Sequence, residues 1–196
     1  MSEPSQRAGS LRERKQQRAR QAIIDAALSL FAEKGFDQVT VTDIAERAEV
    51  GRSTFFRYFG DKQEVVFAGD TAAETVEKVA SQLPVDRPIG DSLPAALGCV
   101  RTVVVLFAET LTEHADMYTL HQQLVDQHPE LYARSLQKQR AYAEAMTKML
   151  VERGSDQETA TLAAEIGIAC YYAGQAAAGD APQNLPGAVE AAFARL

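Results

Sequence analysis

The segment from Thr40 to Phe59 limits the possible folds more than any other part of the chain. Thr40 followed three residues later by Asp43 is a capping box, which predicts a helix that begins at Val41. A tight turn near Val50 follows, and a second short helix runs to Phe59. Longer segments with helical periodicity lie on both sides. Two helices of fewer than about ten residues around a tight turn predict a helix-turn-helix.

The rest of the chain also shows helical periodicity, and no strand alternation extends beyond a few residues. Gly35 indicates the end of the first long helix, and Pro129 is placed to begin another. The expected fold class is all-α with about nine helices, and residues 1–10 are expected to form a disordered arm. We expect helices at about 15–34, 41–48, 52–59, 62–82, 130–153, 156–178 and 186–195. Two more are expected between 95 and 129, one that passes through Val100, Val104 and Phe107 and one that ends at about Gln127.

Charge is distributed unevenly along this chain, whose formal net charge is −7. Residues 1–62 carry 11 Lys and Arg against 9 Asp and Glu, whereas residues 63–196 carry 9 against 18. Six of the bases lie between Arg7 and Arg20, where they can neutralise nucleic-acid phosphates; a solvated basic tail is the alternative. We therefore expect a DNA-binding domain over 1–62 and a second helical domain over 63–196.

The second short helix has two different faces. Val50, Phe55 and Phe59 recur at helical spacing, so they are expected to pack inward. Arginine forms bidentate hydrogen bonds with guanine, and an aromatic ring can cover a thymine methyl group. The outward face is therefore suited to the DNA major groove; the alternative is ordinary surface arginines beside a core Phe56. This face carries Arg52, Ser53, Phe56 and Arg57.

Several strings between residues 22 and 66 occur in a characteristic order. They are Ala26-Ala27-Leu28-Ser29-Leu30-Phe31, Gly35-Phe36, Thr40-Val41-Thr42-Asp43-Ile44-Ala45, Thr54-Phe55-Phe56-Arg57-Tyr58-Phe59 and then Lys62. In these strings the chain resembles the tetracycline-repressor (TetR) family of transcriptional regulators, and the last one looks like an actinobacterial subset. The resemblance implies phosphate contacts from Thr40, Thr54, Tyr58 and Lys62, and base contacts from Arg52, Ser53, Phe56 and Arg57. Arg18, one of the bases of the N-terminal segment, and Thr42 are further candidate DNA contacts.

Three positions depart from the family pattern. Glu49 stands where the turn usually has glycine, and a left-handed backbone there costs about 1 kcal/mol. Gly51 replaces the usual serine cap of the second short helix and is a weaker cap. Phe56 stands where tyrosine is common, and it has no hydroxyl group for a phosphate.

The resemblance also implies that residues 63–196 form a ligand-binding and dimerisation domain, and it implies a function for the whole chain. It implies a repressor that binds a palindromic operator as a homodimer and is released by a small-molecule effector. A lipophilic effector is favoured, and acyl-CoA-like and cationic effectors remain open. The candidate ligand-binding residues are Phe67, Phe107, Leu111, Met117, Tyr118, His121, Leu124, Tyr142, Met146 and Tyr171. Small and apolar residues near the C-terminus are the candidate dimer contacts: Leu162, Ile166, Gly167, Cys170, Gly174, Val189 and Phe193.

Other function classes lack their sequence signals. The chain has no nucleophile elbow, P-loop, zinc-protease motif or dinucleotide glycine motif, so an enzyme is not expected. Its three histidines are seven residues apart, about 10 Å along a helix, so neither a metal nor another cofactor is expected. The N-terminus has no secretory signal, and a cytoplasmic location is expected. A non-specific architectural DNA binder is the other alternative, which the acidic second domain disfavours.

Overall fold

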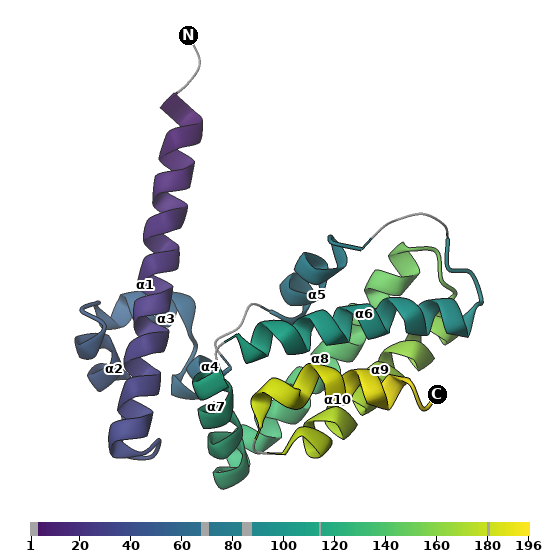
Figure 1. Cartoon of the computed structure of the whole chain (residues 1–196). Helices are drawn as coiled ribbons and strands as arrows, with labels where there is room; N and C mark the ends of the chain where they lie inside the picture. The colour runs from purple at the N-terminus through teal and green to yellow at the C-terminus, as the bar shows by residue number, and fades with distance from the viewer. Residues whose placement is uncertain (1–3, 68–70, 84–87, 114, 180) are drawn as a thin grey trace. The chain divides into compact units, whose positions relative to one another are not determined.

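The computed structural model describes residues 4–67, 71–83, 88–113, 115–179 and 181–196 (Figure 1). Over these residues the chain forms ten α-helices, one short 3-10 helix and no strand. The expected all-α fold class is confirmed, with one helix more than expected. The elements are α1 (Pro4–Lys34), α2 (Val41–Arg47), α3 (Arg52–Tyr58), α4 (Lys62–Val66), α5 (Ala72–Ala80), α6 (Leu93–Thr112), α7 (Ala115–Gln127), α8 (Pro129–Glu152), α9 (Gln157–Ala178), η1 (Pro182–Asn184) and α10 (Leu185–Phe193).

The chain divides into two compact units, residues 1–68 and residues 69–196. The first unit contains α1 to α4, and the second contains α5 to α10. The division falls after residue 68 rather than after residue 62, because α4 packs against α1 within the first unit. The functions assigned to the two parts from sequence remain predictions.

The first unit is built around one small apolar core. Its fully buried side chains include Ile23 and Leu30 from α1, Ile44 from α2, Phe55 from α3 and Val65 from α4. Each short helix thus contributes a large apolar side chain, which is how helices too short to be stable alone are held in place.

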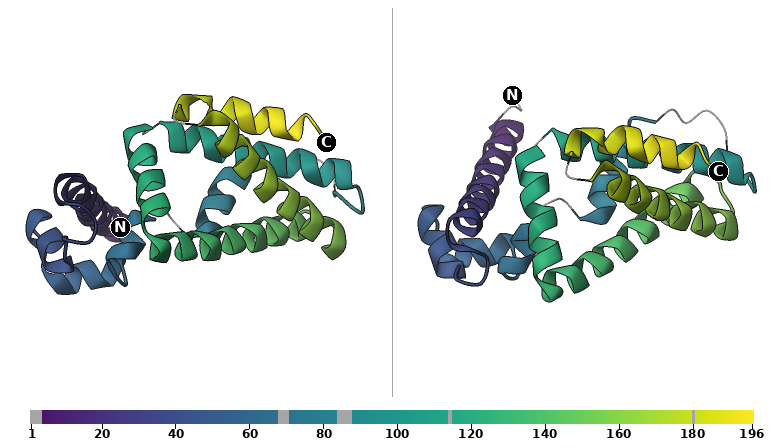
Figure 2. Two further views of the ribbon diagram at one scale, coloured as in Figure 1. Left: turned by 90° about the horizontal axis from the view of Figure 1, so that it is seen from below. Right: turned by 60° about the horizontal axis from the view of Figure 1, so that its bottom comes forward.

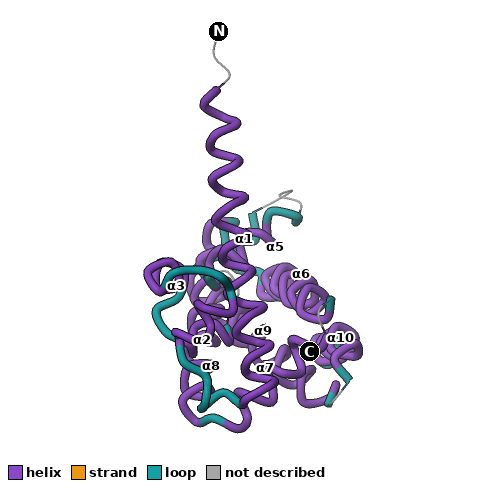
Figure 3. The backbone as a smooth tube through the Cα atoms, turned by 90° about the vertical axis from the view of Figure 1, so that its left-hand side faces the viewer, coloured by secondary structure: helices purple, strands orange, loops and turns teal. Residues whose placement is uncertain are grey.

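The disordered arm expected over residues 1–10 is wrong from Pro4 onward, because α1 begins there. Proline is tolerated in the first turn of a helix, since its missing N–H would have no partner there. Gly9 does not interrupt the helix. Figures 1 and 3 show α1 continuing far past α2 and α3 toward the N-terminus. Residues 1–3 lie outside the described part of the chain.

The single helix expected over residues 62–82 is also wrong, because α4 ends at Val66 and α5 begins only at Ala72. Thr71 and Glu74 form a second capping box at the start of α5. The Glu74 amide donates to Thr71 Oγ1 at 3.2 Å, and the Thr71 amide donates to Glu74 Oε2 at 2.8 Å. This local start signal favours a new helix over continuation of the previous one.

Helix α9 is the centre of the second unit, where it packs against α6, α8 and α10. Figure 2 shows α7 joining the end of α6 to the start of α8, with α9 crossing back between them. Two glycines allow these close contacts. A Cβ atom at Gly167 would lie 2.2 Å from Val100 Cγ1, and one at Gly174 would lie 2.7 Å from the Val189 backbone.

Among the described residues, one helix, α6, is long and apolar enough to cross a membrane by length and composition. Core helices of soluble proteins pass the same test, so this is weak evidence for a membrane span. Helix α6 packs against both α9 and α10.

Candidate nucleic-acid interface

The capping box predicted at the start of α2 is present. The Asp43 amide donates to Thr40 Oγ1 at 3.2 Å, and the Thr40 amide donates to Asp43 Oδ2 at 2.8 Å. The Thr40 hydroxyl donates to the same carboxylate oxygen. Hydrogen bonds from the Thr40 side chain and backbone hold the pKa of Asp43 below its usual value. The Thr40 hydroxyl therefore stabilises the helix start, and its contact with a phosphate stays a prediction.

The turn between α2 and α3 has the backbone expected from its sequence. Glu49 has φ +53°, the left-handed conformation that glycine would adopt without strain. The Val50 amide donates to the Ala45 carbonyl oxygen at 2.9 Å, which closes the turn. Gly51 is the N-cap of α3 and, because it has no side chain, it makes no capping hydrogen bond. Helix α3 is therefore oriented by the turn and by its buried ring rather than by its cap.

Helix α3 shows the predicted division into two faces. Phe55 is fully buried and Phe59 is 3% exposed, and their ring centroids are 5.8 Å apart. Phe56 is 49% exposed, which is unusual for a large apolar side chain in the first unit. The residues exposed on the outward face are Arg52, Ser53, Phe56 and Arg57. Exposed arginines flanking an exposed ring form a surface that can read base edges in a groove.

The other predicted DNA contacts also lie in the first unit. Arg18 on α1 and Thr42 on α2 are exposed, whereas Thr54 and Tyr58 on α3 are half-buried. The Arg57 guanidinium lies 5.0 Å from the centre of the Tyr58 ring, and its Nη2 donates to the Tyr58 hydroxyl at 3.5 Å. Arg57 and Tyr58 thus extend together from the last turn of α3.

Lys62, predicted as a phosphate contact, has interactions inside the first unit that the sequence did not reveal. Its Nζ donates to the carbonyl oxygens of Phe36 at 2.8 Å and Val39 at 3.1 Å, and it lies 4.3 Å from the Phe36 ring centre. The half-buried ammonium group therefore holds the turn between α1 and α2. A phosphate contact by Lys62 stays a prediction.

An exposed ion pair joins α2 to α1, and sequence reasoning missed it too. Arg47 donates to both carboxylate oxygens of Glu33, at 3.0 and 2.9 Å, and Ser29 Oγ donates to Glu33 Oε1 at 2.8 Å. Hydrogen bonds from Arg47 and then Ser29 lower the pKa of Glu33 to about 2. The two residues lie on different helices, so no local spacing in the sequence predicts this pair.

Known proteins share this first unit. The family profile described as bacterial regulatory proteins, tetR family, matches residues 23–68, which include α2, α3 and α4. The HTH-type transcriptional regulator TcmR of Streptomyces glaucescens is 32% identical over 146 residues. The chain belongs to the TetR family. The TcmR match covers 73% of this chain and 63% of TcmR.

A second relative of this TetR-family chain, MftR of Mycobacterium tuberculosis, is 31% identical over 139 residues, or 70% of this chain and 66% of MftR. The matches thus span less than two thirds of the length of either relative. Among solved structures, the SmeT–triclosan complex has a TM-score of 0.55 over 90% of both chains, at 18% identity. At that identity the likeness establishes the TetR fold alone.

The predicted ligand-binding residues are spread over both units. Phe67 follows α4 in the first unit, and the others lie on α6 to α9 in the second. Leu124 and Met146 are buried in the core of the second unit, and Met117 is 38% exposed. Leu111 and His121 are half-buried.

Four of the predicted ligand-binding residues come together in space. The Phe107 ring lies 5.3 Å from the Tyr142 ring and 6.0 Å from the Tyr171 ring. Tyr171 is hydrogen-bonded to Tyr118. Tyr172, which the sequence did not single out, packs edge-on against Tyr171 at 5.2 Å. We call Phe107, Tyr118, Tyr142, Tyr171 and Tyr172 the aromatic cluster.

The predicted dimer contacts separate into two groups. Leu162 is 50% exposed and Ile166 is half-buried, so both retain surface for a second copy. The other five are buried within this chain, and their contact with a second copy stays a prediction. These five buried residues are Gly167, Cys170, Gly174, Val189 and Phe193.

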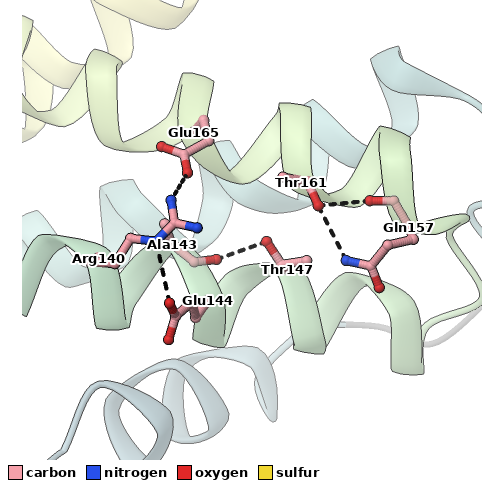
Figure 4. Close-up of polar contacts among 7 residues, drawn as sticks. All are labelled: Arg140, Ala143, Glu144, Thr147, Gln157, Thr161 and Glu165. Carbon is pink, nitrogen blue, oxygen red and sulfur yellow. Dashed lines mark hydrogen bonds and ion pairs between the residues drawn. The ribbon is translucent and has the colours of Figure 1, made fainter.

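An open groove of about 520 Å³ lies between α8 and α9. Arg140 on one side contacts Glu165 at 2.6 Å and Glu144 at 3.2 Å (Figure 4). Thr161 accepts a hydrogen bond from the Gln157 amide group at 3.2 Å. Exposed ion pairs of this kind contribute little stability. The groove contains none of the predicted ligand-binding residues.

Proposed function

We propose that this TetR-family chain is a transcriptional repressor that binds a palindromic operator as a homodimer and is released by a small lipophilic molecule. A cytoplasmic location is part of this proposal. The outward face of α3 supports it most directly. Phe55 fixes α3 by its burial in the core of the first unit. Arg52, Phe56 and Arg57 are exposed together on the outward face of the helix. A recognition helix needs this combination of a fixed backbone and free polar and apolar side chains.

The proposed homodimer follows from the geometry of DNA. Two recognition helices read a palindrome when a two-fold axis places them one helical turn apart, about 34–36 Å. We place the contact on the exposed side of α9, where Leu162 and Ile166 retain apolar surface. A charge in this surface should separate the subunits, so Leu162→Glu should lower the mass measured by sedimentation equilibrium. Unchanged dimers in Leu162→Glu would contradict this placement.

Release by a ligand requires that the ligand bind the form without DNA more tightly than the DNA-bound form. A continuous helix over 62–82 is absent, so it does not transmit the effect.

The test begins with selection of bound duplexes from a random library, using the purified full chain, followed by gel-shift titration. Arg57→Ala should lose about 1–3 kcal/mol of discrimination at one base position. Arg18→Ala is the matched control, because it removes a predicted phosphate contact. It should weaken binding to all sequences equally and reduce the slope of log affinity against log salt concentration by about one. A specificity ratio near one against random DNA would favour the architectural binder instead. Equal losses on all sequences for Arg57→Ala would remove its base-reading role.

A further inference from the structure

The aromatic cluster brings ring faces from three helices to one place in the second unit. Phe107 comes from α6, Tyr142 from α8 and Tyr171 from α9, with ring centroids 5.3 and 6.0 Å from Phe107. All three side chains are half-buried rather than enclosed in the core. The cluster therefore keeps aromatic surface on which a further ring can pack. Flat rings pack on such surfaces in offset or edge-on arrangements.

The groups that bond to the hydroxyls of Tyr118 and Tyr172 are neutral. Gln175 Nε2 donates to the Tyr118 hydroxyl at 3.1 Å, and Gln122 and Tyr171 also bond to that hydroxyl. Gln139 bonds to the hydroxyl of Tyr172. Burial raises the pKa of Tyr118 and raises that of Tyr172 to about 12, so both phenols stay protonated at neutral pH. Phenols and amides offer donors and acceptors without charge.

Two of the four helices that form the cluster, α7 and α9, carry no Lys or Arg side chain. The sequence has no Lys or Arg between Arg101 and Arg134, or between Arg153 and Arg195. All of α7 and all of α9 fall within these two stretches. A phosphate or a carboxylate bound here would find no Lys or Arg cation on α7 or α9, although a cation normally accompanies such a group in a site. The lack of these cations on the two helices disfavours an acyl-CoA as the ligand.

The remaining charged groups near these helices do not change this conclusion. The bases on α6 and α8 already have interaction partners. Arg101 pairs with Glu190, Arg140 with Glu144 and Glu165, and Lys148 with Glu152. Arg134 and Lys138, which precede Tyr142 on α8, also have partners. Glu109, Glu113 and Asp116 are exposed to solvent. They are therefore not buried where they could bind a cationic ligand inside the unit.

We propose that the aromatic cluster binds a planar polycyclic aromatic molecule that carries hydroxyl or keto groups and no phosphate. This proposal rests on the proposed function, since it names the chemical class of the effector. The rings of Phe107 and Tyr142 pack against the ligand's flat faces. The hydroxyl of Tyr118 and the amide of Gln175 bond to its oxygen atoms.

The test uses isothermal titration of the full chain at pH 7 with emodin, a hydroxyanthraquinone, and with dodecanoyl-coenzyme A. Emodin should bind, and Phe107→Leu should weaken it at least tenfold because a ring face is lost while apolar volume remains. Phe193→Leu is the matched control, since it makes the same change in the core of α10, and it should alter emodin affinity less than twofold. Tyr118→Phe, which keeps the ring, should weaken emodin at least threefold and serves if Phe107→Leu does not fold.

Absence of emodin binding, or equal affinities of Phe107→Leu and Phe193→Leu, would overturn the proposal. The proposal would also be overturned if dodecanoyl-coenzyme A bound more tightly than emodin and Lys138→Met weakened that binding. The gel shift on the selected operator, run on the same protein, separates the two hypotheses. A protein that binds the operator but not emodin fails only the proposal on ligand class. A protein that binds no DNA sequence selectively fails the proposed function, whatever it does with emodin.

Discussion

The ammonium group of Lys62 lies beneath the turn between α1 and α2, 2.8 Å from the carbonyl oxygen of Phe36 and 4.3 Å from the centre of its ring. One charged side chain at the start of α4 therefore satisfies backbone carbonyl groups that precede α2. The predicted DNA-contact residue Thr40 follows this turn directly. Lys62 thus positions part of the unit that is predicted to bind DNA, in addition to its own predicted phosphate contact.

Replacing Lys62 should destabilise the first unit. Lys62→Met keeps the length of the side chain and removes charged hydrogen bonds to two carbonyl oxygens, which should cost about 1–3 kcal/mol. Urea unfolding at pH 7 measures the loss. Lys34→Met, which removes an exposed lysine at the end of α1, is the control. Equal midpoints for both variants would contradict the positioning role and leave Lys62 as a surface charge.

Replacing Glu49, the strained turn residue, should raise the stability of the protein, whereas replacing Lys62 should lower it. Glu49→Gly should stabilise the protein by about 1 kcal/mol, because glycine adopts φ +53° without a clash from Cβ. Glu46→Gly, three residues earlier inside α2, should destabilise by about 1 kcal/mol. Thermal unfolding of the two variants should therefore shift in opposite directions. A lower melting temperature for Glu49→Gly would show that the glutamate side chain makes a compensating contact.

The ion pair between Glu33 and Arg47 predicts a pH dependence. Its carboxyl has a pKa of about 2 in the folded protein and 4.5 as its ordinary value. The contribution is therefore complete above about pH 4.5 and is lost as the pH falls toward 2. Glu33→Gln should be less stable than the unaltered protein at pH 7, and the difference should narrow in urea unfolding at pH 3. A difference that stays constant with pH would exclude the pair as its cause.

The close contact between α9 and α10 predicts the result of adding one methyl group. Gly174→Ala should destabilise by about 1–3 kcal/mol, because the new Cβ would lie 2.6 Å from Val189 Cγ2 and 2.7 Å from its backbone. Gly187→Ala is the matched control, since a Cβ there meets no atom within 4 Å. It should be neutral or stabilising by up to about 1 kcal/mol. Unfolding that depends on protein concentration only for Gly174→Ala would instead indicate a contact between subunits.

Several parts of the candidate interface could be predicted because neighbours in sequence create them. The Thr40–Asp43 capping box and the left-handed backbone at Glu49 each depend on a few adjacent residues. The burial of Phe55 and the exposure of Phe56 follow from their positions on a short helix whose inner face must be covered. Thr71 and Glu74 are an equally local signal for the start of α5, and this signal is incompatible with the continuous helix expected over 62–82.

The amino-acid sequence by itself determined the all-α class, the helix-turn-helix and the two faces of α3, because short-range hydrogen bonds and periodic apolar positions decide these features. Only the tertiary structure decided which elements each helix face meets. It placed Gly174 against Val189 within the second unit, Lys62 beneath Phe36, and Tyr171 beside Phe107. Each of these pairs joins residues far apart along the chain. The physical reason is that helical periodicity shows that a face is apolar or small, while the partner of that face depends on how all the helices pack together.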